Sequence, residues 1–184
     1  MIPIYVLGAG GHGRVVLDIL RRAGTPAAGV FDDARSDTLE DTRVLGRLAD
    51  ALTQAGACIP AFGDPALRRR WATAAEQAGL TLVRALHPAA TIARSAAVGA
   101  GTVVCAGAVV GPGATIGRHA IVNTRAVVDH DCTVGDNAHI APGAVLCGQV
   151  RVGTDALVGA GAVLLPGVAI PAGATVPAGS VRRA

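Results

Sequence analysis

A histidine between two acids is the feature of this sequence that most suggests chemistry. Asp129, His130 and Asp131 are consecutive, in a stretch that otherwise carries little charge. A carboxylate that accepts a hydrogen bond from one ring nitrogen fixes the histidine tautomer and raises the basicity of the other nitrogen. We therefore predict that His130 is a general base, partnered by one of the flanking acids, that takes a proton from an amine or hydroxyl attacking a thioester. The alternative is a solvated polar corner.

A second candidate site is a glycine-rich loop near the start of the chain. The residues Gly8-Ala-Gly10-Gly-His12-Gly13 follow an expected strand and open an expected helix, and Asp32 and Asp33 end the next strand. This is the dinucleotide-binding pattern, in which the helix start receives a phosphate and the acid a ribose. NAD is the first ligand to consider. However, only about 85 residues are available, and half of such a fold suits one nucleotide better. A nucleotide sugar is favoured, and a tight turn that binds nothing is the alternative.

The elements that position these residues differ between the two parts of the chain. From Ile92 to Val176 every sixth residue is Ile, Val or Leu, and a small residue follows four positions later, from Ala96 to Ser180. A repeat of six residues makes a short strand and a corner, and three repeats close one triangular coil of eighteen residues. The pattern predicts a left-handed parallel β-helix of about five coils, about 24 Å tall at the strand spacing of a sheet.

Residues eighteen apart stack in such a coil. His130 should therefore lie directly beneath Gly148, which would leave a gap where a ligand can approach. The three histidines of the repeat, His119, His130 and His139, are 11 and 9 residues apart, so no two share a stack. We therefore predict no metal site, and we expect His119 to be an exposed turn residue. Asn123, seven residues before His130, is a candidate for orienting a substrate.

The first part of the chain alternates strands and helices, which predicts a parallel sheet of Rossmann type. Asp64 and Pro65 should cap and open one helix. We expect residues 1–86 to form this unit and residues 87–184 to form the β-helix, with residues 86–88 as the bridge. The run Arg68–Arg70 is interpreted as a solvated face. The expected strands are 2–7, 28–31, 58–62 and 80–83, and the expected helices are 14–23, 48–55 and 64–78.

Composition excludes several classes of protein. The chain has 184 residues, 51% hydrophobic and 16% charged, so a disordered protein is excluded. The net charge of +3 and the scattered arginines exclude a nucleic-acid-binding arm. Two uncharged stretches, 96–117 and 156–181, are interrupted by Gly and Pro in the rhythm of the repeat, which does not suit a membrane span. None of the four cysteines forms a CxxC pair, so we expect a cytoplasmic protein with reduced thiols.

The chain resembles the sugar O- and N-acyltransferases of the sialic-acid O-acetyltransferase type, which include the acetyltransferase of bacillosamine synthesis. The likeness covers nearly the whole chain. Its motifs begin at Tyr5, Phe31, Phe62, Asn123, Asp129 and Ala138 and read YVLGAGGHGRVV, FDD, FGD, NT, DHDC and AHIAPGA. The resemblance implies homotrimers with acetyl-CoA between adjacent solenoids.

Particular residues take roles by this resemblance. It implies that His130 is the general base and that Asp131 raises its basicity. It implies that acetyl-CoA is contacted by His139, Gly148 and Ala160. The nucleotide-sugar contacts would be Gly10, Gly11, His12, Asp32, Asp33 and Gly63. One departure is that aspartates flank the base here, where well-known relatives have glutamate, so the pair has a shorter reach.

These observations lead to one leading hypothesis and two alternatives. The leading hypothesis is an acetyl-CoA-dependent N-acetyltransferase that acts on a UDP-activated amino sugar. The first alternative is an O-acetyltransferase of a sialic-acid-type sugar that uses the same residues. The second is a non-catalytic, nucleotide-binding scaffold whose solenoid only forms trimers.

Overall fold

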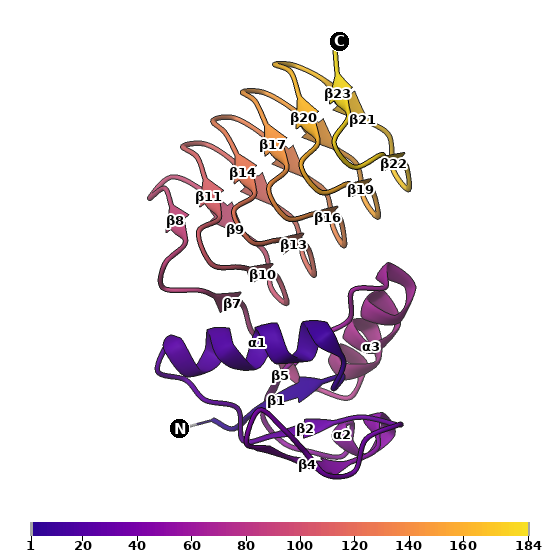
Figure 1. The fold of residues 1–184 in the computed structure, drawn as a ribbon. Coiled ribbons are helices and arrows are strands. Elements are labelled where there is room, and N and C mark those ends of the chain that lie inside the picture. The colour runs from indigo at the N-terminus through magenta and orange to yellow at the C-terminus, as the bar shows by residue number, and fades with distance from the viewer. Residues whose placement is uncertain (1, 184) are drawn as a thin grey trace.

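The computed structural model describes residues 2–183, and the solenoid is its largest feature (Figure 1). Its short strands stack into three parallel sheets, which we call the first, second and third faces. The first face contains β7 (Ala85–Leu86), β10 (Val103–Val104), β13 (Ile121–Val122), β16 (His139–Ile140), β19 (Leu157–Val158) and β22 (Thr175–Val176). The second contains β8 (Thr91–Ile92), β11 (Val109–Val110), β14 (Val127–Val128), β17 (Val145–Leu146), β20 (Val163–Leu164) and β23 (Val181–Arg182). The third contains β9 (Ala97–Val98), β12 (Thr115–Ile116), β15 (Thr133–Val134), β18 (Arg151–Val152) and β21 (Ala169–Ile170).

The register of these sheets confirms the predicted stacking of residues eighteen apart. Val110, for example, pairs with Ile92 on one side and with Val128 on the other. The aliphatic residue of most repeats points inward and is fully buried, together with the small residue that precedes the next strand. The solenoid is thus the predicted left-handed β-helix. It begins with β7, whose Leu86 is the first residue of the expected bridge between the units, and ends with β23. It is therefore one strand longer at each end than the repeat indicated.

The solenoid corners have a backbone regularity of their own. From Gly101 to Gly179, every sixth residue has a positive φ, which glycine adopts most readily. Glycine holds this position in the coils at both ends of the stack, whereas in the middle coils it does so only at Gly143. The other middle positions are His119, Arg125, Asp131, Asn137, Gln149 and Asp155. A left-handed backbone costs about 1–2 kcal/mol for an ordinary residue. The middle coils therefore present polar side chains where the fold alone would favour glycine.

The α/β unit has the sheet order β3-β4-β2-β1-β5-β6. Its pairs are parallel except β3–β4, so the predicted Rossmann-type sheet is confirmed with an added antiparallel edge. That edge was missed, and the helix expected over 48–55 is shorter in the structure. The elements are β1 (Ile4–Leu7), α1 (Gly11–Arg22), β2 (Gly29–Phe31), β3 (Thr38–Leu39), β4 (Thr42–Gly46), α2 (Leu48–Ala51), β5 (Ala57–Pro60), α3 (Pro65–Gln77) and β6 (Thr81–Leu82).

Two helices of this unit lie against the solenoid (Figure 1). The apolar side of α1 packs in one buried cluster with the sheet and with Ala85, Val103 and Cys105 of the solenoid. Helix α3 begins as predicted, because the Asp64 carboxylate accepts a hydrogen bond of 2.8 Å from the Leu67 amide. Gly63, in the loop before α3, lines a cavity together with His139 of β16, so this loop faces the first face of the solenoid.

Candidate functional site

The acid–histidine–acid motif forms the predicted pair at an exposed corner between the second and third faces. His130 Nδ1 lies 2.9 Å from Asp131 Oδ2, and the His130 amide donates to Asp129 Oδ1 at 2.7 Å. The hydrogen bond with Asp131, and then the charge of Asp129, raise the pKa of His130 above its ordinary value. Because the carboxylate accepts at Nδ1, the proton of neutral His130 belongs there. Nε2 is left with a free lone pair.

Gly148 lies directly over this imidazole, as the eighteen-residue stacking predicted. A Cβ at Gly148 would be 2.5 Å from His130 Nε2 and 2.6 Å from Cε1. These distances are shorter than any real carbon contact, so a side chain here would push the imidazole away. The absence of a side chain at Gly148 therefore allows the His130 imidazole, with its Nε2, to remain beneath this corner.

A second histidine occupies the first face. His139 Nε2 lies 3.0 Å from the Asn123 side-chain nitrogen, and Asn123 Oδ1 accepts from the Thr124 amide at 2.8 Å. The Thr124 amide can only donate, so it identifies the amide oxygen and leaves Nδ2 to donate to His139. His139 Nε2 must then be unprotonated, and neutral His139 carries its proton on Nδ1. Burial, and then the charge of Arg68, lower the pKa of His139 to about 4.

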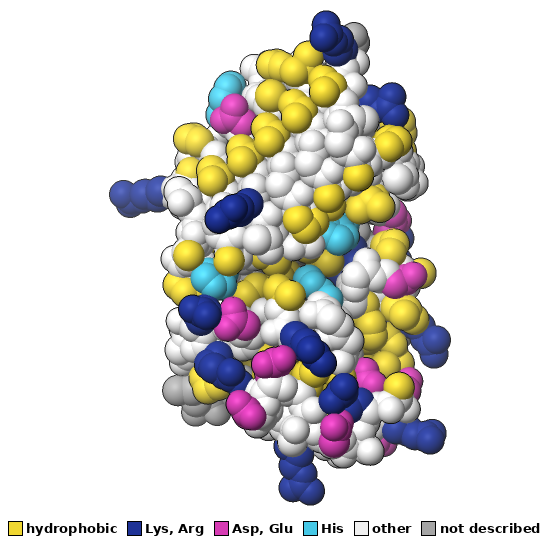
Figure 2. Space-filling view, in the orientation of Figure 1, with side chains coloured by type: hydrophobic (Ala, Val, Ile, Leu, Met, Phe, Trp, Pro, Cys, Tyr) yellow, Lys and Arg dark blue, Asp and Glu magenta, His cyan; other side chains and the backbone are white. Residues whose placement is uncertain are grey.

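His12 lies close to His139, at the start of α1. Burial, and then the charges of His139 and Arg68, lower the pKa of His12 to about 4. Its Nε2 is buried and has no hydrogen-bond partner among the described residues. In Figure 2, histidine side chains are visible in the zone where the α/β unit meets the solenoid. Two neutral imidazoles therefore lie between the glycine-rich loop and the first face.

The glycines of the loop divide into two kinds. Gly8 has a φ of +109°, and a Cβ at Gly13 would lie 2.3 Å from the Gly8 carbonyl oxygen, so both are required for the close approach of strand and helix. Gly10 and Gly11, in contrast, have open space where a Cβ would be. Gly10 is the N-cap of α1 and supplies no side-chain acceptor to the first turn. The amides at this helix start are suited to an anion.

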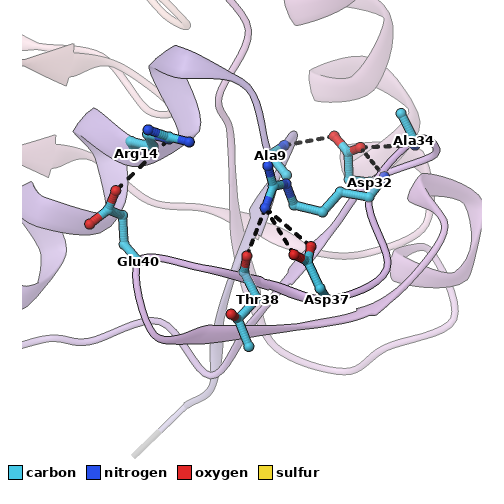
Figure 3. A network of polar contacts seen from close by, with 8 residues as sticks. Ala9, Arg14, Asp32, Ala34, Asp37, Thr38 and Glu40 are labelled. Carbon is cyan, nitrogen blue, oxygen red and sulfur yellow. Dashed lines mark hydrogen bonds and ion pairs between the residues drawn. The ribbon is translucent and has the colours of Figure 1, made fainter.

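The two acids after β2 hold the neighbouring loops. Asp32 accepts from the amides of Ala9, Ala34 and Arg35 at 2.7, 2.9 and 3.0 Å (Figure 3). Asp33 accepts from the first amide of α2, that of Leu48, at 3.0 Å. A carboxylate has about four acceptor positions, so these bonds leave capacity for a ligand.

One chain brings the candidate residues together in two separate groups. His12, Asn123, Gly63 and His139 lie between the α/β unit and the first face. Gly63 and His139 line one cavity of about 200 Å³. His130, Asp131 and Gly148 lie at the corner between the second and third faces. Ala160 is exposed at a different corner, between the first and second faces.

Two interpretations of charged residues are wrong. Arg68 is completely buried rather than solvated, and it donates to backbone carbonyls of both units. The sequence does contain a pattern that indicates the burial of Arg68. The buried positions of α3 are Arg68, Trp71, Ala72 and Ala75, the i, i+3, i+4, i+7 pattern of a packed helix face. His119 is a turn residue, as expected, but it is half-buried, and its Nδ1 is enclosed by protein.

Asn137 and Asp155 were not singled out from the sequence, and they help to join the units. The Asn137 side-chain nitrogen donates to the Pro65 carbonyl at 2.9 Å and to Asp155 Oδ1 at 2.7 Å. Asp155 also pairs with Arg69, and Glu76 pairs with Arg118. Both Asn137 and Asp155 are left-handed corner residues, and that position is the signal that could have identified them.

Among residues 2–183, no group of three or more His, Cys, Asp or Glu side chains is arranged to hold a metal ion. No helix of the described chain combines the length and the apolar character needed to cross a bilayer.

The chain matches two family models. Residues 3–75 match the PglD N-terminal domain, and residues 113–148 match the bacterial transferase hexapeptide of six repeats. The chain is also 35% identical over 116 residues to UDP-N-acetylbacillosamine N-acetyltransferase of Bacillus subtilis strain 168. That match covers 58% of this chain and 52% of the relative, so it spans about half the length of the curated protein.

Solved structures match over almost the whole chain. The acetyltransferase domain of PglB from Neisseria gonorrhoeae, in complex with acetyl coenzyme A, is 34% identical with a TM-score of 0.95. This match covers 98% of this chain and 90% of that one. PerB from Caulobacter crescentus, in complex with CoA and GDP-perosamine, is 36% identical with a TM-score of 0.94, and the match covers 98% and 88%. The chain therefore belongs to the family of sugar acetyltransferases that join a PglD N-terminal domain to a hexapeptide-repeat solenoid.

Proposed function

We propose that this protein transfers the acetyl group of acetyl-CoA to the amine of a nucleotide-activated amino sugar. The observation that carries the proposal is the His130–Asp131 pair, whose Nε2 is free beneath Gly148. The relatives support it, because they are named as N-acetyltransferases of such sugars or are seen with acetyl-CoA, or with CoA and a nucleotide sugar. The alternatives are O-acetylation of a sialic-acid-type sugar and a non-catalytic scaffold.

The chemistry requires one proton acceptor. His130 Nε2 takes the proton of the sugar amine as the nitrogen attacks the thioester carbonyl carbon. The C–N bond forms, the C–S bond breaks, and the proton finally resides on the leaving thiol. Asp131 holds the ring by Nδ1 and stabilises the imidazolium that forms. His139 offers a fixed Nδ1–H donor, which suits a contact with the acyl end of acetyl-CoA.

Asp131→Asn tests this division of labour through pH. A carboxylate that raises the pKa of His130 moves the rise of kcat/KM to higher pH, because the base is active only when unprotonated. Asparagine removes the charge and keeps the shape. In Asp131→Asn we expect the rise of kcat/KM to shift to lower pH. The plateau value of kcat/KM should also fall, but by less than in a variant without the imidazole. A pH profile of kcat/KM checks this, and an unchanged limb would contradict the role of Asp131.

The nucleotide sugar would be held by the α/β unit, residues 1–86, and acetyl-CoA by residues 87–184. Amides at Gly10, Gly11 and His12 suit the diphosphate, Asp32 and Asp33 suit the ribose or base, and Gly63 lies beside the sugar. His139, Gly148 and Ala160 would contact acetyl-CoA. The four free cysteines support a reducing, cytoplasmic location.

The nucleotide preference can be measured without turnover. We expect calorimetry to detect binding of UDP and none of NAD, because the unit has room for one nucleotide. GDP is the third ligand to titrate, since the Caulobacter crescentus relative is seen with GDP-perosamine. Tight NAD binding without UDP binding would reverse the assignment. Assays with UDP- and GDP-amino sugars, and with sialic acid, then separate the N-transferase from its alternatives.

The separation of the two residue groups supports a homotrimer with shared sites. If catalysis needs both His130 and His139, a neighbouring prism must bring one corner to the other chain's first face. A heterologous ring of three chains does this with one repeated interface. The flat, Ala- and Gly-rich faces of the solenoid are suited to such contacts.

Mixing two impaired variants tests the shared site. Chains with His130→Ala and with His139→Ala, denatured together and refolded at equal amounts, form mixed rings. Roughly a quarter of the interfaces would then have both histidines, by random assortment around a cyclic oligomer. We expect about that fraction of wild-type activity at limiting acetyl-CoA, together with a trimer mass in sedimentation equilibrium. No recovery, or a monomer at micromolar concentration, would place each site within one chain.

A further inference from the structure

Arg68 is the buried charge that joins the two units. It is one of three consecutive arginines on α3, but Arg69 and Arg70 are exposed whereas Arg68 has no accessible surface. Arginine is rarely buried unless its donors are bonded. No carboxylate of residues 2–183 lies within 4.0 Å of this guanidinium, so ion pairing does not account for its position.

Backbone carbonyls from both units surround the guanidinium. On its own side, NH1 donates to the carbonyls of Phe62 and Gly63 at 2.8 and 3.1 Å. On the solenoid side, Nε donates to the His119 carbonyl at 2.8 Å and NH2 to the Asn137 carbonyl at 2.7 Å. The last two residues are eighteen apart, at the same corner of successive coils. A planar fork of N–H groups can reach all four acceptors, whereas a compact ammonium cannot.

The bonded carbonyls flank the proposed site. Gly63 belongs to the loop that follows β5, and Asn137 precedes His139 by two residues. Gly63 and Pro65 of the α/β unit line one cavity together with Asn137 and His139 of the solenoid. The width of that cavity therefore depends on how the Phe62–Gly63 carbonyls and the Asn137 carbonyl are held, and the same guanidinium holds both.

We propose that Arg68 is a positioning residue that sets the loop beside the sugar against the coil that carries His139. The inference rests on the proposed function for the identity of the two substrates. It adds that transfer depends on a group that touches neither of them. The positive charge of Arg68 also helps to keep His12 and His139 neutral.

The matched test compares Arg68→Met with Arg70→Met, the same change at an exposed position of the same helix. We expect Arg68→Met to lower kcat/KM for the nucleotide sugar by roughly 10²-fold, the scale of a misplaced reactant. The Kd of acetyl-CoA should change much less, because the coil that carries His139 stays paired with the coils on either side. Arg70→Met should match the wild type. If Arg68→Met does not fold, Arg68→Lys keeps the charge without the fork and should show the same pattern more weakly.

A readout that needs no turnover separates this proposal from the proposed function. Hydrogen exchange should become faster in Arg68→Met over residues 62–64 and 137–139, with the far coils unchanged. Wild-type protein without transferase activity would reject the proposed function, and the exchange pattern would then decide the role of Arg68. Equal exchange and equal kcat/KM in the Arg68 and Arg70 variants would overturn the proposal, and so would a uniform loss of protection over the whole chain.

Discussion

His130→Ala is expected to lower kcat by roughly 10²–10⁴-fold, which is the usual contribution of a general base. The KM values should change little, because the exposed ring is not the main contact of either substrate. The limb of the pH profile that reports a histidine should vanish with the side chain. Steady-state kinetics at several pH values, with both substrates varied, measure all three effects.

The matched control is Arg94→Ala. Residue 94 is exposed at the same corner of the solenoid two coils away, and it has no role in the proposed site. Its removal should leave kcat unchanged. A His130 variant with near-normal kcat, beside an inactive His139→Ala, would mean that the wrong base has been named. If the amine instead loses its proton in solution, the defect of the His130 variant will shrink as pH approaches the amine's own pKa.

Gly148→Ala should lower kcat by about 10²-fold, although one methyl group is all that is added. The new carbon would lie 2.5 Å from His130 Nε2 and must displace the imidazole from its place beside Asp131. A shift of about 1 Å in a reacting group costs on this order. The thermal midpoint should fall only slightly, because His130 is exposed and free to rotate outward.

A double-mutant cycle identifies the cause of the Gly148 defect. If Gly148→Ala acts by moving the imidazole, adding it to His130→Ala should cost almost nothing more in kcat. A full further loss in the double variant would mean that the methyl group obstructs acetyl-CoA instead. Calorimetric titration of acetyl-CoA against each single variant distinguishes the two cases directly.

The repeat made the solenoid predictable because each of its strands buries the same kind of residue. An aliphatic side chain at every sixth position specifies the inward direction from Ile92 to Val176 without reference to the rest of the chain. The stacking of Gly148 over His130 followed from the same arithmetic. The antiparallel pair β3–β4 was missed because only Val44 of the five residues of β4 is buried. A strand with so little buried surface shows no strong alternation of hydrophobic and polar residues, and this alternation is what predicts a strand from sequence.

The contacts between the units could not be predicted in the same way. Burial of Arg68 depends on which side of α3 packs on the solenoid, and tertiary packing decides this. Three adjacent arginines suggest an exposed surface and give no sign that one of them is buried. The bond between Asn123 and His139 joins neighbouring coils across sixteen residues, so simple stacking at eighteen does not produce it. That Asn123 orients a substrate stays a prediction, and in the structure its side-chain amide also fixes the tautomer of His139.

The buried cluster beneath α1 has a further consequence for motion. Val16, Ile19 and Leu20 pack at once on the sheet and on Ala85 and Val103 of the solenoid, so the two units share one core. A hinge between them would open that core to water, and each buried aliphatic side chain is worth about 1.5–3 kcal/mol. The α/β unit and the first coils should therefore unfold together in one cooperative step. Substrates would therefore enter a cleft that is already open, because the two units cannot close on each other as rigid bodies.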